Sequence, residues 1–258
     1  MNRVANKVCL VTGGANGIGE AISRLLVSEG ATVVITDIAD GKGEALAEEL
    51  NQDETKAYYR HQDVTSEAAW NTLFDWLKTQ FGRLDVLVNN AGGGTYNDLE
   101  TLSLSDWHGI MSLNVDSAFM GTQRAVSLMK QGEGGSIVNM SSVGGLVGSP
   151  NLVAYSAAKA AVKLFSKCAA IHCGQQGYNI RVNTVHPGLV KTVSGMDMAT
   201  KATGMSAEEA EAAFTTLHPI GRLGVPAEIA AMVLFLASDE SSFATGGEFV
   251  VDGGYTAA

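Results

Sequence analysis

Short apolar runs rich in β-branched residues alternate along the chain with longer stretches of helical period. Consecutive apolar positions within most of these runs are typical of strands that are buried on both faces of a parallel sheet. The pattern therefore predicts an α/β fold, a doubly wound parallel sheet of about seven strands with helices on both faces. The runs are KVCLVT, ATVVITD, AYYRHQDV, LDVLVNN, GSIVNMSS, IRVNTVHP and GEFVVDGG.

Stretches with the period of a helix lie between these runs, and several begin with a recognisable start signal. No linker, internal repeat or low-complexity tract separates them, so we expect one domain over residues 1–258. The expected helices cover residues 18–29, 41–50, 66–81, 105–130, 153–176 and 226–238. The start signals are Asp40 or Gly41, Ser66 with Glu67, Ser105 with Asp106, and Pro226 in a first turn.

Residues 191–217 have the weakest periodicity in the chain and join the sixth strand to the last expected helix. A long insertion with glycines and methionines at this place suggests a mobile loop over a site. A plain helical excursion is the equally open alternative.

Composition and charge exclude several classes of function. A chain of 258 residues with 46% hydrophobic residues fits a single α/β domain. The formal charge of -10, with 17 scattered Lys and Arg residues, argues against nucleic acid and against an acidic membrane surface. No run approaches the roughly 18 apolar residues of a membrane span, and the N-terminus lacks a secretory pattern. We therefore expect a cytoplasmic protein with no membrane partner.

Three cysteines, Cys9, Cys168 and Cys173, cannot build a disulfide framework, which favours a reduced compartment. Cys168 and His172 share a helix face at positions i and i+4. A zinc site needs at least three protein ligands, and no second pair with ligand spacing is present. We therefore expect three packed thiols and no metal.

A glycine-rich turn, VTGGANGIGEA over residues 11–21, follows the first run and opens the first expected helix. Such a turn lets backbone N–H groups approach a pyrophosphate, and Gly13, Gly17 and Gly19 are its key glycines. The expected contacts include Asn16 and Ile18 between them. On its own the turn is a weak signal, because similar turns serve S-adenosylmethionine, flavin or no ligand.

Asp37 ends the second run about twenty residues after the glycines, where a carboxylate accepts hydrogen bonds from both hydroxyls of an adenosine ribose. This favours NAD, with Ile38 as a further contact. The 2′-phosphate of NADP would face Asp37, and two unit charges about 4 Å apart at an effective dielectric constant near 20 repel by roughly 4 kcal/mol. Lys42 is the nearest basic residue and can swing toward this position. A solvated turn residue is the alternative for Asp37.

Tyr155 and Lys159, in the stretch YSAAK, lie at i and i+4 on one face of an expected helix. A free tyrosine has a pKa near ~10, and an adjacent ammonium lowers it by favouring the phenolate, as the positive nicotinamide would. The pair is therefore a candidate proton-transfer group. Tyr and Lys also meet on solvated helix faces. Ser141 and Ser142, however, end the preceding strand at the edge of the sheet where ligands bind.

Taken together, these motifs make the chain resemble the short-chain dehydrogenase/reductase family over essentially its whole length. The resemblance implies a Rossmann-type, NAD-binding catalytic domain. The matching motifs are Thr12-Gly13-x-x-x-Gly17-Ile18-Gly19, Asp63-Val64, Asn89-Asn90-Ala91-Gly92, Asn114 in SLNV, Ser142 with Tyr155 and Lys159, and Pro187-Gly188 with Thr192.

The resemblance also implies roles for the catalytic residues. Tyr155 would exchange the proton with the alcohol, and Ser142 would hydrogen-bond the alcohol oxygen. Lys159 would hold the nicotinamide ribose and lower the pKa of Tyr155, while Asn114 would anchor a water that relays protons. The family spacing of serine and tyrosine favours Ser142, and Ser141 is the alternative.

Further residues are implied to contact the coenzyme. Asp63 and Val64 would lie at the adenine ring, although Asp63 could instead cap the helix expected near Ser66. The adenosine side would be lined by Asn90, Ala91 and Gly92, whose motif could also be a structural turn. The carboxamide would be held after Pro187 and Gly188 by Val190 and Thr192.

The reaction implied is hydride transfer between a carbinol carbon and the nicotinamide, without a metal. The candidate pocket stretches at 93–97, 143–153 and 193–217 are mostly small or apolar, and only Lys191 and Lys201 supply positive charge. This favours a neutral, hydrophobic secondary alcohol or ketone. In IRVNTVHPG, VLFLASDESS and VDGGYTA the chain is also similar to bacterial cyclic-alcohol and hydroxysteroid dehydrogenases.

Three other functions are less well supported. A 3-oxoacyl carrier-protein reductase of the same family would prefer NADPH and a basic docking face. A non-catalytic dinucleotide sensor has no need for Ser142, Tyr155 and Lys159 together, and a methyltransferase gives no reason for the Tyr/Lys pair. Small and apolar surface expected on the helices near 155–170 and 226–237 predicts a homotetramer, with a dimer as the alternative.

Overall fold

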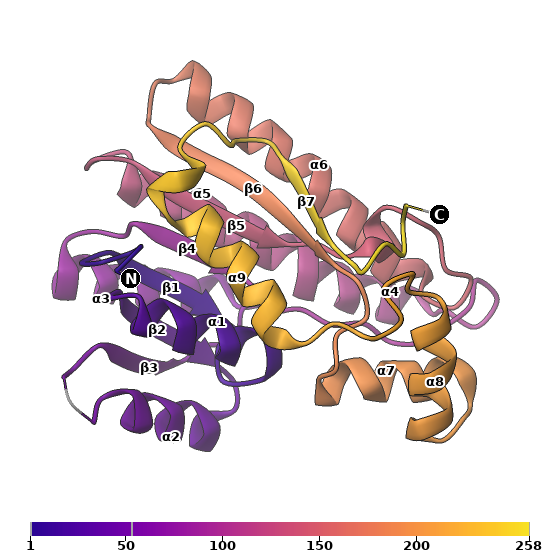
Figure 1. The fold of residues 1–258 in the computed structure, drawn as a ribbon. Helices are drawn as coiled ribbons and strands as arrows, with labels where there is room; N and C mark the ends of the chain where they lie inside the picture. The colour runs from indigo at the N-terminus through magenta and orange to yellow at the C-terminus, as the bar shows by residue number, and fades with distance from the viewer. Residues whose placement is uncertain (1, 53, 258) are drawn as a thin grey trace.

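The computed structural model describes residues 2–52 and 54–257, and its centre is a seven-stranded, all-parallel sheet (Figure 1). The strands are in the order β3-β2-β1-β4-β5-β6-β7. This confirms the predicted fold class. The strands are β1 (Val8–Thr12), β2 (Thr32–Asp37), β3 (Ala57–His61), β4 (Val86–Asn89), β5 (Gly135–Met140), β6 (Ile180–Pro187) and β7 (Glu248–Val251).

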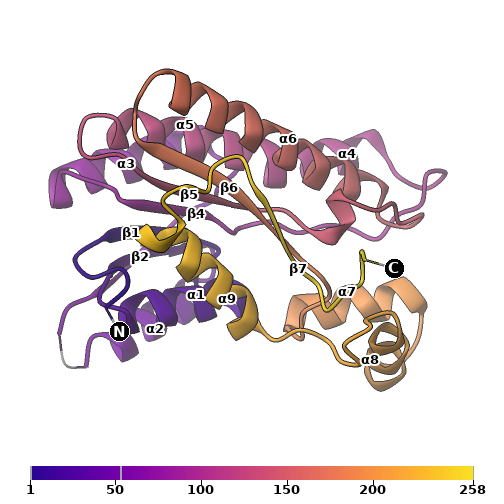
Figure 2. The ribbon, with the colours of Figure 1, turned by 45° about the horizontal axis from the view of Figure 1, so that its top comes forward.

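Helices cover both faces of the sheet (Figure 2). On one face α1, α2 and α9 pack together, and on the other α3, α5 and α6 form the second layer. The helices are α1 (Gly17–Ser28), α2 (Asp40–Leu50), α3 (Glu67–Phe81), α4 (Leu104–Met111), α5 (Ser117–Met129), α6 (Val153–Gln175), α7 (Val193–Thr203), α8 (Ala207–Thr216) and α9 (Pro226–Ala237).

One expected helix is divided in the structure, and a segment whose form was left open is helical. The single helix expected over 105–130 is divided into α4 and α5 by a π turn at Ser112–Asp116, and α4 is capped by Ser103 instead of beginning at Ser105. Residues 191–217 contain α7 and α8, so this segment is a helical excursion and not an irregular loop.

The core consists of two large apolar clusters, one on each face of the sheet, and a smaller one formed by Ile110, Ala154 and Ala158 between α4 and α6. Trp70 of α3 is fully buried, and its indole N–H donates to the carbonyl of Val64 at 2.8 Å. On the other face, Ile22 of α1 and Ile229 of α9 pack against the strands. Cys9 and Cys173 are buried as expected, whereas Cys168 is exposed, which corrects the expectation that all three thiols are packed.

The strand order places a topological switch point between β1 and β4. From β1 the chain winds toward β3, and it then returns to β4 on the opposite side of β1. The loops that leave β1 and β4 therefore diverge at the carboxyl edge of the sheet, and ligands of open α/β folds bind at this place.

Candidate active site

An open cleft of about 1880 Å³ runs along the carboxyl edge of the sheet, between the loops that follow the strands and the α7–α8 segment. The residues predicted for the coenzyme and the chemistry line it, with the exception of Asn114, which is buried. They are Gly13, Asn16, Gly17, Ile18, Gly19, Asp37, Ile38, Asp63, Val64, Asn90, Ala91, Gly92, Ser142, Tyr155, Lys159, Pro187, Gly188, Val190 and Thr192.

The turn between β1 and α1 is packed so closely that side chains are excluded from it. A Cβ atom on Gly19 would lie 2.0 Å from the carbonyl oxygen of Gly13, and Gly13 itself has a φ of +59°. Helix α1 begins at Gly17, so its unpaired N–H groups lie at the cleft. A pyrophosphate fits this end of the cleft, because the backbone can approach it closely.

The loop after β4 braces this turn. The Thr12 hydroxyl accepts hydrogen bonds from the backbone N–H groups of Asn90 and Ala91 at 3.1 and 3.0 Å. In return, the Asn90 side chain donates to the carbonyls of Thr12 and Gly13, both at 3.0 Å. The NNAG motif is therefore a structural turn and a wall of the cleft at once.

Asp37 lies where the end of β2 meets the glycine-rich turn. Its carboxylate accepts hydrogen bonds from the backbone N–H groups of Ala15 at 3.2 Å and Ala39 at 3.1 Å. Across the turn, Lys42 donates to the side-chain oxygen of Asn16 at 2.8 Å. Asp37 is thus tied to the turn, which argues against a solvated turn residue, and Lys42 is already bound to the same turn.

Asp63 is exposed at the cleft and held by the segment that leads into α3. Its carboxylate accepts hydrogen bonds from the backbone N–H and the hydroxyl of Thr65 at 2.9 and 2.7 Å, and these bonds lower the pKa of Asp63. The cap of α3 is Ser66, whose hydroxyl accepts from the N–H of Ala69 at 3.2 Å. Asp63 therefore does not cap the helix.

Residues 187–192 follow β6 and reach the glycine-rich turn. A Cβ atom on Gly17 would lie 3.3 Å from the Cγ2 methyl of Thr192, so the two segments are in contact. The Thr192 hydroxyl accepts from the N–H of Gly195 at 2.9 Å and caps α7. Val190 pairs with Gly224 in an isolated bridge. Both residues are held at the boundary between the sheet and the α7–α8 segment.

Ser142 and Tyr155 are neighbours: a Cβ atom on Gly144 would lie 3.4 Å from the Tyr155 ring and 3.6 Å from Oγ of Ser142. The Ser142 hydroxyl also accepts from the backbone N–H of Gly144 at 3.1 Å. Ser141 has a different environment, because its buried hydroxyl donates to the carbonyl of Lys159 at 2.9 Å. Of the two adjacent serines, Ser142 is the one beside Tyr155.

Lys159 is buried one helical turn after Tyr155. Its ammonium donates to the carbonyl of Met140, at the end of β5, at 2.9 Å and lies 5.6 Å from the centroid of the Tyr155 ring. Burial lowers the pKa of Lys159 to about 8. The strand end and the helix face therefore bring the two groups together as the sequence predicted.

The pKa of Tyr155 departs from the prediction. Burial raises the pKa of Tyr155 in this structure, and the neighbouring hydroxyl of Ser142 opposes that rise. The glycines on both sides explain the burial: a Cβ atom on Gly94 would lie 2.8 Å from the ring, and one on Gly144 would lie 3.4 Å from it. Desolvation is the largest cause of the shift, because the backbone packs against the phenol ring on two sides.

Asn114 is buried within the π turn that joins α4 to α5. Its side chain donates to the carbonyls of Gly93 at 2.7 Å and Ile110 at 2.9 Å, and it accepts from the N–H of Gly93 at 3.2 Å. A Cβ atom on Gly92 would lie 2.7 Å from Oδ1 of Asn114 and 3.1 Å from Nζ of Lys159. The amide and the ammonium therefore meet at the backbone of Gly92, where only glycine leaves room.

Sequence reasoning missed several contacts of the cleft. The Tyr96 hydroxyl accepts a hydrogen bond from the Asn151 side chain at 2.8 Å, which ties the loop after β4 to the segment before α6. His218 and Tyr255 form an aromatic pair 5.4 Å apart, and both line the cleft. No local sequence signal marks these contacts, because the partners come from separate segments that only the fold brings together.

Neither a metal cluster nor a membrane span is found in the part of the chain that the structure describes. No group of three or more His, Cys, Asp or Glu residues there is arranged to hold a metal ion. Among the helices of residues 2–52 and 54–257, none has the length and apolar character to cross a bilayer.

The parallel sheet and the cleft at its switch point define a Rossmann-like α/β protein. The family profile described as Enoyl-(Acyl carrier protein) reductase matches residues 13–256. The chain is 44% identical to the NADP-dependent (R)-specific alcohol dehydrogenase of Lentilactobacillus kefiri over 99% of each chain. It is 43% identical to the cyclopentanol dehydrogenase of Comamonas testosteroni over 100% of each chain.

A third relative is the 3-alpha-(or 20-beta)-hydroxysteroid dehydrogenase of Mycobacterium tuberculosis, 43% identical over 99% of this chain and 91% of the relative. The chain belongs to the short-chain dehydrogenase/reductase family. The family uses nicotinamide dinucleotides, and these relatives support oxidation and reduction between alcohols and ketones.

Proposed function

We propose that this chain is an NAD-dependent oxidoreductase that interconverts a neutral, hydrophobic secondary alcohol and its ketone. One observation carries the proposal. Ser142, Tyr155 and Lys159 converge at one end of a cleft whose other end is formed by the glycine-rich turn and Asp37. A sensor or a methyltransferase would need only the second end.

Residues at the two ends of the cleft would hold the two ends of the coenzyme. The glycine-rich turn and the start of α1 would bind the pyrophosphate, Asp37 the adenosine ribose, and Lys159 the nicotinamide ribose. When bound, NAD supplies the hydride acceptor and a positive charge near the Tyr155 hydroxyl. The remaining expected contacts are Asn16, Ile18 and Ile38 at the turn and ribose, Asp63 and Val64 at the adenine, Asn90, Ala91 and Gly92 at the adenosine side, and Pro187, Gly188, Val190 and Thr192 at the carboxamide.

Proton transfer would be carried out by Tyr155. As the phenolate, its oxygen would accept the proton of the substrate alcohol, and as the phenol it would return that proton to the ketone oxygen in the reverse reaction, while Ser142 hydrogen-bonds the same substrate oxygen. The ammonium of Lys159 stabilises the phenolate because it is held beside the ring. Asn114 meets Lys159 at Gly92, which supports a role for the amide in relaying protons out of the site.

NAD is favoured over NADP by the carboxylate at the ribose position. Asp37 is fixed by two backbone bonds, and a 2′-phosphate beside it would be repelled by roughly 4 kcal/mol. The NADP dependence of the Lentilactobacillus kefiri relative belongs to that protein, and at 44% identity the coenzyme must be argued from this chain's own residues.

A change at Asp37 tests this preference. In Asp37→Ser, we expect kcat/KM for NADP relative to NAD to rise by about 10²-fold, because most of the repulsion disappears. Initial rates with each coenzyme measure the ratio. Lys42→Ala is the control, since it removes the nearest cation without removing the carboxylate. A wild-type enzyme that already prefers NADP, with a preference lost in Lys42→Ala, would contradict the assignment.

The substrate side of the cleft supports a neutral, apolar ligand. Both lysines of the rim are paired with carboxylates, Lys191 with Glu211 and Lys201 with Asp197, each at 2.7 Å. A carrier-protein substrate would need an unpaired basic rim for its phosphopantetheine. This observation weighs against the 3-oxoacyl reductase alternative. Helices α7 and α8, which border this side, are the segment we propose to move over the substrate.

Exposed apolar side chains support a homotetramer. One such region consists of Phe119 on α5 with Leu164 and Ile171 on α6. In another, Val250 lies on the edge strand β7 and Phe243 precedes that strand. Helix α9 is instead packed against α1 within the chain, so it contributes less surface than its sequence suggested. The solution mass from light scattering should be about four times that of one chain.

The proposed chemistry is tested by NADH formation across a panel of hydrophobic secondary alcohols. We expect turnover by the wild-type enzyme and a loss of about 10³-fold or more in Tyr155→Phe, with NAD affinity and thermal stability retained. Tyr96→Phe is the matched control, because it removes a phenol of the same cleft that has no part in proton transfer. Equal rates in Tyr155→Phe and the wild type would refute the assignment.

A further inference from the structure

We propose that His186 is a positioning residue that holds Ser142, through its main chain, in the orientation that its hydroxyl needs. The inference rests on the proposed function, in which the Ser142 hydroxyl binds the substrate oxygen. His186 lies on β6, next to the strand that leads to Ser142, and it is completely buried. His186 is not among the residues that line the cleft.

The ladder between β5 and β6 ends just before Ser142. The register runs to Met140 opposite Val185, and the N–H of Ser141 makes the last backbone bond with the carbonyl of Val185 at 2.8 Å. Ser142 continues in an extended conformation, with φ -168° and ψ 161°. Its carbonyl has no partner on the β6 backbone and is bound by Nδ1 of His186 at 3.2 Å. The imidazole thus extends the ladder by one step.

The proton positions on the imidazole follow from its partners. The carbonyl of Ser142 only accepts, so Nδ1 must carry the proton, and a neutral ring then leaves Nε2 as an acceptor. Nε2 lies 2.9 Å from the Thr184 hydroxyl, whose single proton then goes to Nε2 and not to the Gly247 carbonyl at 3.2 Å. That carbonyl keeps its hydrogen bond from the backbone N–H of Thr184 at 3.0 Å. Burial lowers the pKa of His186, which keeps the ring neutral at pH 7. Both ring nitrogens are therefore satisfied in one tautomer.

The Ser142 carbonyl receives a second hydrogen bond from the N–H of Gly145 at 2.9 Å. The two donors approach from different segments, Gly145 from the turn after Ser142 and His186 from the neighbouring strand. The hydrogen bond from Gly145 holds Ser142 only within its own turn. The hydrogen bond from the imidazole holds Ser142 relative to strand β6 and therefore to the sheet. Since Lys159 is bound to the end of β5, His186 also keeps Ser142 in register with Lys159.

The test compares two substitutions at the same position. Asparagine places an amide nitrogen near the position of Nδ1, so His186→Asn keeps the donor, whereas His186→Leu removes it. We expect kcat to fall about tenfold in His186→Leu, which loses one hydrogen bond to the Ser142 carbonyl. In His186→Asn, which keeps the donor, kcat should stay within about threefold of wild type. Thr184→Val is the matched control, because it removes the bond on the far side of the ring and should lower thermal stability but not kcat.

A double-mutant cycle separates positioning from general destabilisation. If His186 acts through Ser142, His186→Leu should cause no further loss of kcat in a Ser142→Ala background. Independent, multiplying losses, or a His186→Leu enzyme as active as the wild type, would overturn the inference. NADH binding, followed by fluorescence, should be unchanged in all these variants.

A readout without turnover distinguishes failure of this inference from failure of the proposed function. Long-range proton–nitrogen correlation spectra of the intact protein report which imidazole nitrogen carries the proton. A proton on Nδ1 supports the inference even if no alcohol of the panel is oxidised. A proton on Nε2, with Nδ1 bare, overturns it even if the enzyme is active and depends on Tyr155.

Discussion

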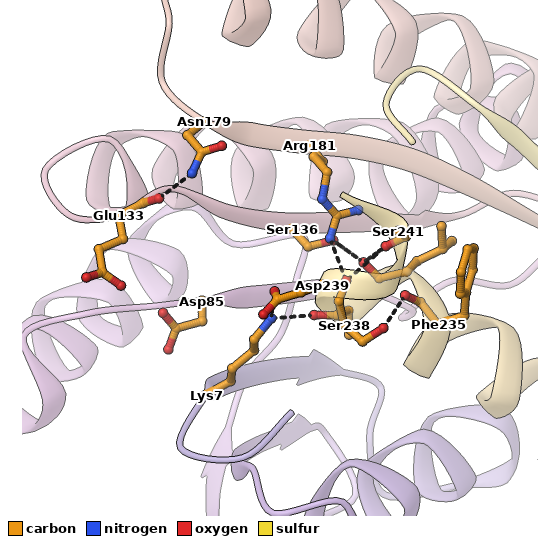
Figure 3. Close-up of polar contacts among 12 residues, drawn as sticks. Lys7, Asp85, Glu133, Ser136, Asn179, Arg181, Phe235, Ser238, Asp239 and Ser241 are labelled. Atoms are coloured by element: carbon orange, nitrogen blue, oxygen red, sulfur yellow. Dashed lines mark hydrogen bonds and ion pairs between the residues drawn. The ribbon is translucent and has the colours of Figure 1, made fainter. Parts of the chain in front are cut away.

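The two edges of the sheet carry similar polar residues that are used in different ways. At the amino edge, Lys7 donates to the carbonyl of Ala237 at 3.1 Å and pairs with Asp239 at 2.6 Å. Arg181 donates to the carbonyls of Leu236 at 2.8 Å and Ser238 at 3.1 Å. Figure 3 shows both side chains reaching the end of α9 from different parts of the chain. They satisfy carbonyls that the helix leaves unpaired.

At the carboxyl edge, polar groups instead have hydrogen-bond donors and acceptors that face the open cleft. Lys159 makes one hydrogen bond to the protein, although an ammonium can donate three. The side chains of Ser142 and Tyr155 lie next to each other and line the open cleft. Burial of a polar group therefore does not by itself mark a functional site. The difference lies in whether its remaining donors and acceptors face protein or open space.

The largest effect that tests this contrast is expected for Lys159→Met. Removing the ammonium should lower kcat/KM by about 10³-fold, since Lys159 would both stabilise the Tyr155 phenolate and hold the coenzyme. Folding should not suffer, because a buried charge is replaced by an apolar side chain of similar length. Initial rates and thermal unfolding of the same preparation measure both. A variant that unfolds at much lower temperature would show that the carboxyl edge also stabilises the fold.

The pH dependence of that stability has a definite sign. Burial lowers the pKa of Lys159 to about 8 from its ordinary value of 10.5, so between these values the unfolded chain binds a proton that the folded chain does not. Raising the pH through this window should therefore stabilise the wild type relative to Lys159→Met, by about 1.4 kcal/mol per pH unit. Below pH 8 the difference should be constant. A difference that does not change between pH 8 and 10 contradicts this sign.

The second prediction compares the adjacent serines. Ser142→Ala should lower kcat by about 10²-fold with little change in stability, because its hydroxyl would bind the substrate oxygen. Ser141→Ala should keep kcat within a few-fold and cost about 1 kcal/mol of unfolding free energy, since its hydroxyl is bound to the Lys159 carbonyl. Steady-state rates and denaturant unfolding separate the two. Exchanged phenotypes would transfer the role to Ser141.

Much of the fold and of the candidate site was predictable because a parallel sheet brings all carboxyl ends to one edge. Runs such as IRVNTVHP marked β6, and the motifs after successive strands then had to meet in one cleft. Residue type and strand position were enough to place Asp37 beside the glycine-rich turn.

Contacts between distant segments were not predictable from local patterns. The π turn at Ser112–Asp116, which holds Asn114, has no local signal that distinguishes it from a continuous helix. The direction of the Tyr155 pKa depends on how closely the backbone at Gly94 and Gly144 covers the ring, which only the packed structure determines. The choice of α9 carbonyls as partners for Arg181 is likewise a result of packing.

The smallest expected effect on catalysis is that of Arg181→Met, the counterpart of Lys159→Met at the amino edge. The change should leave kcat and NAD affinity unaltered, because Arg181 lies at the edge of the sheet away from the cleft. Its guanidinium donates to the carbonyls of Leu236 and Ser238 around the end of α9 and, at 3.5 Å, to that of Ala244. The cost should be about 1–2 kcal/mol of unfolding free energy, measured by urea denaturation.

The cost is limited because other donors remain at the end of α9. The Leu236 carbonyl also accepts hydrogen bonds from the hydroxyls of Ser136 at 2.7 Å and Ser241 at 3.0 Å. Adding Ser136→Ala to Arg181→Met should therefore cost more than the two single changes together, since each donor substitutes in part for the other. Strict additivity would show that the donors act independently. A fall in kcat in either variant would show that contacts at the amino edge also affect catalysis, which contradicts the separate roles of the two edges.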